Sequence, residues 1–144
     1  TEEFLMGDRE QARVILDQLR ALGVRVAVDD FGTGYSSLAY LRELPIDELK
    51  LDRSFVQTMA DDPRAAAIVR STISLAHSLG MRLVAEGVEN EITAGHLALS
   101  GCDVSQGFYF SCALPAAELE AWLDDRATPE QAAGPASGSE SAIA

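Results

Sequence analysis

The stretch Val24-Arg-Val-Ala-Val-Asp-Asp-Phe-Gly-Thr-Gly-Tyr-Ser-Ser37 decides how the rest of the chain is interpreted. Its β-branched first part, Val24 to Val28, is too short for a helix and predicts a buried strand. The strand is expected to end at Asp29 and Asp30, and the glycines that follow predict a tight loop. Adjacent carboxylates repel each other unless a cation compensates them, and a divalent metal is a common choice. The stretch therefore predicts a ligand site, with Asp30 as an ordinary cap or turn residue as the alternative.

The composition limits the class of protein. The chain has 144 residues, is 47% hydrophobic and carries a formal net charge of -12, which fits one domain and argues against binding a nucleic acid polymer. No apolar run approaches the roughly 20 residues of a membrane span, and no leader-like segment opens the chain, so a soluble, cytoplasmic protein is expected. Cys102 and Cys112 lack partners at zinc spacing and are expected to be reduced thiols.

Helices and strands are predicted to alternate along the chain, which indicates a parallel sheet with helices outside it. A first helix is expected over 8–22. Strands are expected at 24–28, 46–51, 81–85 and 102–105, alternating with helices at 35–43, 53–60, 62–79, 91–99 and 115–123. The segment 127–144 is rich in small residues, Pro and Gly and predicts a disordered tail, so the folded domain is expected to span 1–126.

Polar residues recur at the carboxyl ends of these predicted strands. Because such ends lie along one edge of a parallel sheet, the residues are expected to converge on one site. They are Asp29, Asp30, Lys50, Glu86 and Gln106.

This set of side chains suits phosphoryl chemistry. Carboxylates at Asp29, Asp30 and Glu86 are hard oxygen ligands for Mg²⁺ or Mn²⁺, as a two-metal hydrolytic site requires. Lys50 is placed to hold an attacking hydroxide or the phosphoryl oxygens, and Glu89, one turn beyond Glu86, to support the loop. Two simpler interpretations stay open: Lys50 as a solvated strand end, and Glu86 as an ion-pair partner of Lys50 or Arg82.

Other motifs favour no further activity. Asp30-Phe31-Gly32 matches the metal triplet of kinases, but the other kinase motifs do not occur. Adjacent residues of a strand point to opposite faces, so Asp29 and Asp30 are not expected to form the carboxylate pair of a glycosidase. His77 and His96 lie in helical stretches and are explained by packing.

Four motifs in this order resemble the EAL domain family, the cyclic di-GMP phosphodiesterases of bacterial signalling. They are Asp29-Asp-Phe-Gly-Thr-Gly-Tyr-Ser-Ser-Leu38, Leu49-Lys-Leu-Asp-Arg-Ser-Phe-Val56, Val84-Ala-Glu-Gly-Val-Glu89 and Gly101-Cys-Asp-Val-Ser-Gln-Gly-Phe108. The resemblance covers about residues 1–123. It implies an α/β fold that is a partial TIM-like (β/α) barrel of about four βα units, the C-terminal portion of the EAL domain.

The resemblance also implies a reaction, the metal-dependent hydrolysis of cyclic di-GMP to linear pGpG. Asp29, Asp30 and Glu86 would be metal ligands, and Lys50 would orient or activate the attacking water. Gln106, Glu89 and Glu2 would support the site from the substrate or outer shell, with Glu2 anchoring the glycine loop. The cofactor would be Mg²⁺ or Mn²⁺.

The match covers only part of that family's domain, which is about twice as long. The Glu-Ala-Leu triplet does not occur, and Thr1-Glu2 resembles the second half of a family motif whose metal-binding glutamate precedes it. Because metal affinity depends on ligand number, the chain alone is expected to be inactive. It is interpreted as a fragment, a truncated remnant, or a half that pairs with an upstream half or in a homodimer. The alternative function is a non-catalytic EAL-like module that binds nucleotide or protein.

Overall fold

The computed structural model describes residues 9–34 and 38–127. The chain divides into two units, residues 1–112 and residues 113–144, which are described separately.

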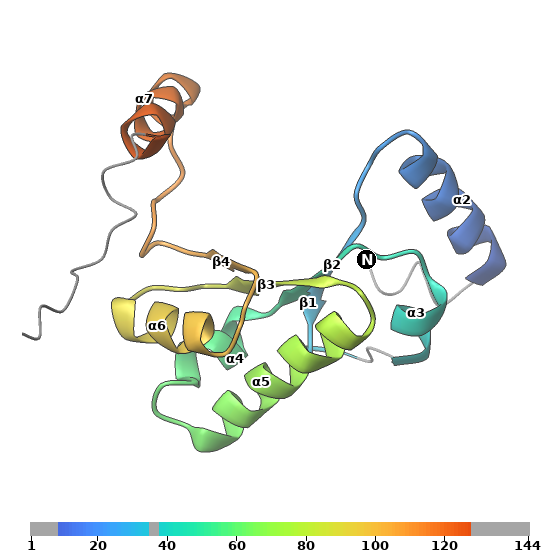
Figure 1. Cartoon of the computed structure of the whole chain (residues 1–144), viewed down its shortest axis with the longest axis horizontal. Coiled ribbons are helices and arrows are strands. Elements are labelled where there is room, and N and C mark those ends of the chain that lie inside the picture. The colour runs from blue at the N-terminus through green and yellow to red at the C-terminus, as the bar shows by residue number, and fades with distance from the viewer. Residues whose placement is uncertain (1–8, 35–37, 128–144) are drawn as a thin grey trace, which may run out of the picture. The chain divides into compact units, whose positions relative to one another are not determined.

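The first unit alternates helices with the strands of one sheet (Figure 1). Its elements are α2 (Arg9–Ala21), β1 (Ala27–Phe31), α3 (Leu38–Glu43), β2 (Glu48–Leu51), α4 (Arg53–Thr58), α5 (Pro63–Ser78), β3 (Arg82–Glu86), α6 (Glu91–Leu99) and β4 (Val104–Gln106). All neighbouring strands are parallel and lie in the order β1-β2-β3-β4. The predicted alternation and the parallel sheet are confirmed.

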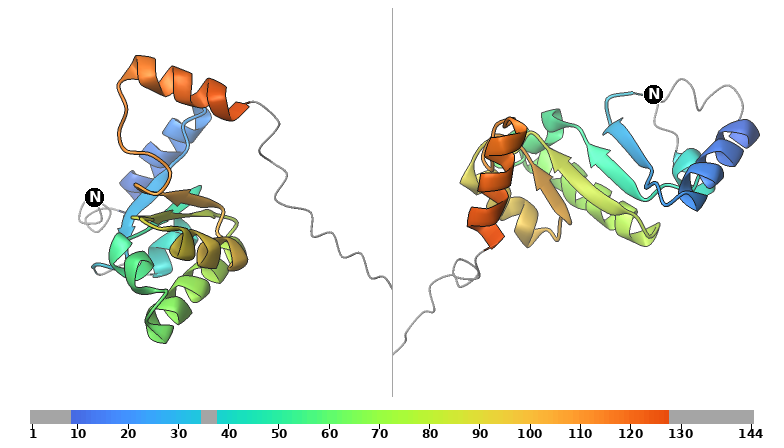
Figure 2. Two further views of the ribbon diagram at one scale, coloured as in Figure 1. Left: turned by 90° about the vertical axis from the view of Figure 1, so that its left-hand side faces the viewer. Right: turned by 90° about the horizontal axis from the view of Figure 1, so that it is seen from above.

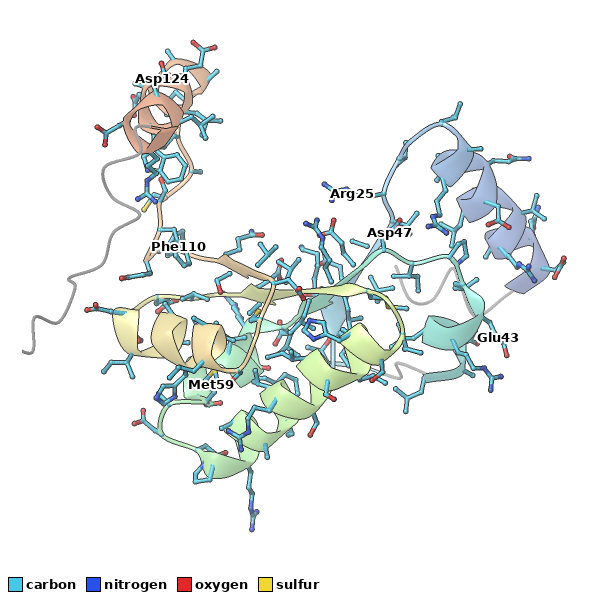
Figure 3. The ribbon with its side chains drawn as sticks, viewed as in Figure 1. Arg25, Glu43, Asp47, Met59, Phe110 and Asp124 are labelled. Atoms are coloured by element: carbon cyan, nitrogen blue, oxygen red, sulfur yellow. The ribbon has the colours of Figure 1, made fainter. Side chains whose placement is uncertain are left out.

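The hydrophobic core lies between one face of the sheet and the helices α4, α5 and α6 (Figure 1 and Figure 2). Alternate residues of a strand point to opposite faces, and Leu49, Leu51 and Leu83 point from β2 and β3 into this core, at most 1% exposed. Figure 3 shows side chains filling the space between the sheet and these helices. The alternate residues, Lys50 and Glu86 among them, belong to the other face.

Local signals set the boundaries of the long helix α5. The Asp62 carboxylate accepts a hydrogen bond from the Arg64 N–H (2.8 Å), and Pro63 occupies the first turn, where no N–H is needed. Asp52 caps α4 in the same way by accepting from the Ser54 N–H (2.9 Å). Both helix starts are as the sequence predicted.

The first strand differs from the prediction. Val24 precedes β1 and is 46% exposed, and the strand begins at Ala27 and continues through the two aspartates to Phe31. The expected strand is present, but its predicted bounds of 24–28 and its predicted burial are wrong. β1 lies at one end of the described sheet and pairs there only with β2, and only Val28 and Phe31 of its residues are partly buried. The other strand and helix bounds shift by a few residues, and Asp8 and residues 35–37 lie outside the described residues.

Two aspartates, one before β2 and one before β4, form hydrogen bonds at the amino ends of the strands. Asp47 accepts from the Val26 N–H (2.8 Å) and pairs with Arg20 of α2 (3.0 Å). Asp103 accepts from the Leu83 N–H (2.8 Å) and from Nε2 of His77 in α5 (2.8 Å). Each carboxylate thus joins a neighbouring strand to the helix that precedes that strand, and Figure 3 labels Asp47 in its place before β2. His77 has this structural role, in keeping with the packing interpretation.

Asp103→Asn is expected to lower the free energy of unfolding by about 1 kcal/mol at neutral pH, since the hydrogen bonds from Leu83 and His77 lose their charged acceptor at a partly exposed site. Burial raises the pKa of Asp103, but the hydrogen bonds from Leu83 and His77 outweigh it and lower the pKa below its usual value. A lowered pKa in the folded state stabilises the fold above the unfolded pKa of about 3.9, and this contribution disappears as the pH falls through the folded value. Urea unfolding of both proteins from about pH 7 down to about pH 2 measures it.

Asp61→Asn is the matched control, because Asp61 is exposed and no side-chain hydrogen bond to it is seen among the described residues. The control should change stability by less than about 0.5 kcal/mol at every pH. An Asp103→Asn penalty of the same size at acid and neutral pH would contradict the charged role of Asp103.

The second unit contains α7 (Ala116–Ala127), in which the Arg126 guanidinium lies 4.1 Å from the centroid of the Trp122 ring. The helix extends four residues beyond the predicted end at Leu123. The predicted tail lies, from residue 128 on, outside the described residues. None of the helices in the described part of the chain is long and apolar enough to cross a membrane.

Candidate metal and phosphodiester site

A bulge in β1 brings two carboxylates to the carboxyl end of the sheet. Val28 pairs with Leu49 and Phe31 with Leu51, so both Asp29 and Asp30 fall opposite the single residue between these partners on β2. Asp30 has φ +53°, a left-handed conformation that Asp tolerates better than most residues.

Thr33 closes the turn that follows the bulge. Its N–H and its hydroxyl both donate to the Asp30 carbonyl, at 3.3 Å and 3.0 Å. The left-handed backbone of Asp30 is therefore held in place by its own loop. Backbone strain of this kind is often found at functional sites.

The bulge corrects the expectation that Asp29 and Asp30 point in opposite directions. One carboxylate oxygen from each of Asp29, Asp30 and Glu86 lies within 4.8 Å of the others. We call these three residues the acidic cluster. An extended strand would send the two aspartates to opposite faces, but the left-handed residue turns the second side chain back toward the first.

Lys50 lies within this cluster. Its Nζ donates to Asp29 Oδ1 (2.7 Å) and to Glu86 Oε1, and its side chain is 26% exposed. The hydrogen bonds to Asp29 and Glu86 raise the pKa of Lys50, against a smaller opposing effect of burial, so the ammonium is charged at neutral pH. The interpretation of Glu86 as an ion-pair partner of Lys50 is thus realised, whereas Arg82 pairs with Glu48 instead (2.9 Å).

Gln106 is placed by a close approach between two loops. It lies opposite Glu86 in the register of β3 and β4, and its carbonyl accepts from the Val88 N–H (3.0 Å). The next residue must be glycine, because a Cβ at Gly107 would lie 2.1 Å from the Val88 carbonyl oxygen. The loop after β4 is therefore locked to the loop after β3, next to the acidic cluster.

A groove of about 450 Å³ adjoins the acidic cluster, and we call it the rim groove. Its lining residues are Asp30, Asp52, Arg53, Glu86, Gly87, Glu89, Gln106, Gly107 and Phe108. The structure thus brings all the predicted site residues to one rim except Glu2, which lies outside the described residues.

Gln57 and Phe108 are among the residues at this rim that were not predicted as part of the site. Gln57 of α4 donates from Nε2 to Glu89 Oε1 (2.7 Å), which fixes that carboxylate at the groove. No sequence signal joins two residues 32 positions apart. Phe108 also lines the groove, and its position directly after the Gln-Gly pair was a signal that could have identified it.

The donor atoms of the acidic cluster fit a divalent cation such as Mg²⁺ or Mn²⁺. All are carboxylate oxygens, the type of ligand these ions prefer, and they lie close enough together to share ions. Lys50 is the cation that compensates them in this structure, and its two hydrogen bonds involve two of the three acids.

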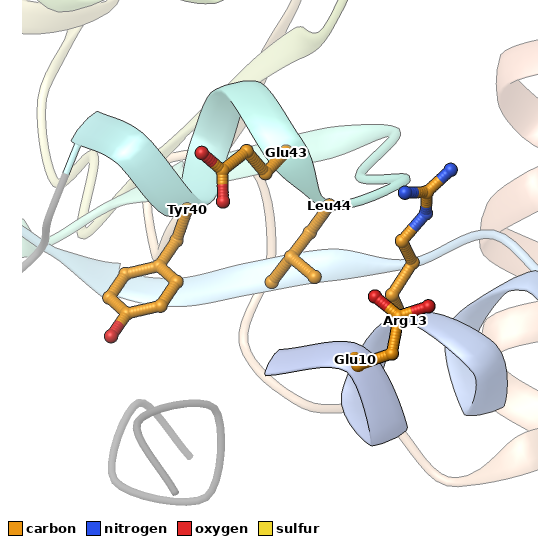
Figure 4. A pocket seen from close by; sticks show the side chains of 5 residues that line it. All are labelled: Glu10, Arg13, Tyr40, Glu43 and Leu44. Atoms are coloured by element: carbon orange, nitrogen blue, oxygen red, sulfur yellow. The ribbon is translucent and has the colours of Figure 1, made fainter. Parts of the chain in front are cut away.

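A second, smaller pocket of about 250 Å³ lies between α2 and the end of α3 (Figure 4). Glu10 and Arg13 line it from α2, and Tyr40, Glu43 and Leu44 line it from the other side. It contains none of the predicted site residues. Its lining combines acidic, basic and apolar side chains and defines no single class of ligand.

Comparison with known sequences identifies relatives of this chain. A sequence model of the EAL domain matches residues 1–113. The bifunctional diguanylate cyclase/cyclic di-GMP phosphodiesterase MucR of Pseudomonas aeruginosa is 47% identical over 119 residues, which are 83% of this chain and 17% of MucR. The chain therefore spans about a sixth of that curated relative.

Solved structures show the same similarity. The PaMucR phosphodiesterase in complex with c-di-GMP matches with a TM-score of 0.74 and 47% identity, over 80% of this chain and 47% of that one. Klebsiella pneumoniae BlrP1, in a manganese/cyclic di-GMP complex, matches with a TM-score of 0.68 and 36% identity, over 75% of this chain and 28% of that one. These similarities confirm the predicted fold class of a partial EAL-type barrel.

Proposed function

We propose, since the chain belongs to the EAL domain family, that its acidic cluster and Lys50 form part of a phosphodiesterase site that hydrolyses cyclic di-GMP to linear pGpG. The observation that carries this proposal is the convergence of Asp29, Asp30 and Glu86 within 4.8 Å, with the Lys50 ammonium between two of them. The c-di-GMP complexes of PaMucR and BlrP1 support the choice of substrate.

The residues take distinct roles in this proposal. Asp29, Asp30 and Glu86 hold divalent metal, which would polarise a phosphodiester oxygen and lower the pKa of a bound water. Lys50 orients the attacking water or the phosphoryl oxygens as a fixed ammonium. Gln106 and Glu89 line the rim groove beside the cluster, and Gln57 holds Glu89 in its orientation.

The 144-residue chain by itself is proposed to be inactive. Its described residues supply the three carboxylates of the acidic cluster, whereas the family pattern includes further ligands that its motifs do not match. Metal affinity falls with the number of ligands, so a partial set of donors binds weakly and positions the reacting groups poorly. The missing ligands would come from an upstream half of the barrel or from a partner.

A hybrid barrel tests this proposal. Residues 1–113 of this chain replace the matching segment of the PaMucR EAL domain, and the release of pGpG from cyclic di-GMP is measured with Mn²⁺. We expect turnover by the hybrid barrel within about tenfold of the parent domain, and none by the 144-residue chain alone. The matched control is the hybrid barrel with Asp29→Asn, which keeps the shape of the side chain but removes a charged ligand.

The outcomes distinguish the functions. A folded hybrid barrel that binds cyclic di-GMP without cleaving it would contradict the catalytic proposal and favour a nucleotide-binding module. Turnover by the 144-residue chain that is lost in its own Asp29→Asn variant would contradict the proposed inactivity and leave the assignment of the site intact.

A further inference from the structure

The rim groove extends beyond the acidic cluster to an aromatic ring. Asp30 and Glu86, which belong to the cluster, line it together with Gln106 and Phe108. Its volume of about 450 Å³ lies within the usual range for small-molecule sites. A nucleotide whose phosphate is held at the cluster therefore has space for a further group beside the Phe108 ring.

The charges of the residues that line the rim groove do not favour an anionic ligand. Asp52 and Glu89 add two carboxylates to those of the acidic cluster, and among the lining residues Arg53 is the only cation. Repulsion between these carboxylates and a phosphodiester opposes binding unless other contacts offset it. Away from the metal ligands, an uncharged contact has to supply affinity.

Phe108 is suited to supply such a contact. Its side chain is 72% exposed, although the aromatic residues Phe31, Phe55 and Phe110 are partly buried against the core. A large apolar ring that stays accessible beside a polar groove has a full face to offer to a ligand.

The backbone that carries this ring is fixed. Val88 donates its N–H to the Gln106 carbonyl (3.0 Å) and accepts from the Tyr109 N–H (3.0 Å), so a hydrogen bond lies on each side of Phe108. The close contact at Gly107 excludes any larger residue between them. Because the loop backbone is already held by these hydrogen bonds, the entropy cost of binding a ligand on the ring comes mainly from ordering the Phe108 side chain.

We propose that the Phe108 ring is the surface on which one base of the bound dinucleotide stacks. This inference rests on the proposed function, since it takes the phosphodiester of cyclic di-GMP to lie at the acidic cluster. Stacking on an aromatic ring uses the face that every base has, and it is not weakened by the negative charge of the groove. Phe108 thus supplies affinity for the base while the acidic cluster holds the phosphate.

Binding of cyclic di-GMP to the full 144-residue chain tests the proposal, by isothermal titration calorimetry with Mn²⁺ present. Phe108→Ala is expected to raise the Kd about tenfold, and Phe108→Trp to keep it within about threefold of the original value. Phe108→Leu is apolar but not planar and should lose most of the affinity. Leu99→Ala is the control, because Leu99 is 90% exposed on α6 and does not line the groove.

Titration of each variant with Mn²⁺ alone separates this inference from the proposed function. Phe108 offers no metal ligand, so its variants should bind Mn²⁺ like the original chain. Binding of cyclic di-GMP that is equal in the Phe108→Ala variant, or fully retained in Phe108→Leu, overturns the stacking role and leaves the proposed function standing. A chain that binds Mn²⁺ but not the dinucleotide also overturns the stacking role. The proposed function is overturned only if the hybrid barrel, which has the full set of family ligands, neither binds Mn²⁺ nor cleaves cyclic di-GMP.

Discussion

Lys50→Met is expected to lower the kcat of the hybrid barrel by about 100- to 1000-fold while leaving its affinity for Mn²⁺ unchanged or higher. The change in kcat and the change in Mn²⁺ affinity differ because the Lys50 ammonium affects the site in two ways. It is a fixed charge for the reacting oxygens, and it also occupies Asp29 and Glu86, which are proposed metal ligands. Methionine is unbranched and reproduces the apolar stem of lysine as far as Cε, and it lacks the ammonium group with its charge and hydrogen bonds.

Two further variants serve as comparisons for Lys50→Met. Asp29→Asn should lower both turnover and Mn²⁺ affinity, since it removes a charged ligand. Arg82→Met removes a cation from the same strand as Glu86. Arg82 lies at the other end of β3, where it pairs with Glu48 of β2, so turnover should stay within about threefold of that of the unsubstituted hybrid barrel. Mn²⁺ titration and pGpG release measure both quantities. If Lys50→Met weakens Mn²⁺ binding as much as Asp29→Asn does, Lys50 has a structural role in holding the acids and not a catalytic one.

The sequence predicted the parts of this fold that depend on local signals. Asp62 and Pro63 predict the start of α5 because an acceptor side chain and a residue without an N–H suit the first helical turn wherever it lies. The alternation of strands and helices predicts the parallel sheet for a similar reason, since only this topology connects such elements by short loops. The predicted sheet in turn predicted that Lys50 and Glu86 lie close together. They are 36 positions apart in the sequence but lie on neighbouring strands.

The error at β1 has a non-local cause. A bulge is defined by the register of one strand against another, and the register of β1 is set by Leu49 and Leu51 on β2. The sequence around Asp29 and Asp30 contains no signal for that register. The strand pattern therefore suggested that the two aspartate side chains point to opposite faces. Their position at the shared strand ends was predicted, but the bulge that turns both into the acidic cluster was not. The bond between Gln57 and Glu89 was missed for the same reason, since it joins the helix after β2 to the loop after β3.

Gly107→Ala is expected to lower the free energy of unfolding by about 1–3 kcal/mol, the usual range for forcing a methyl group into a packed site. An added Cβ would lie 2.1 Å from the Val88 carbonyl oxygen and 2.3 Å from the Val88 nitrogen, so the two loops have to separate. The hydrogen bonds of Val88 to Gln106 and Tyr109 are then strained or lost. Urea unfolding of the 144-residue chain measures the loss, and a lower affinity for cyclic di-GMP should accompany it, because Gln106 moves with the loop.

The same substitution at Gly95 should act in the opposite direction. Gly95 lies within helix α6, where an added Cβ meets no atom within 4 Å, so Gly95→Ala is expected to stabilise the chain by about 0.5–1 kcal/mol. The pair separates the effect of the close approach from the general effect of removing a glycine. If both variants are stabilised, the loops after β3 and β4 are not locked together, and the fixed positions of Gln106 and Phe108 at the rim groove lose their physical basis.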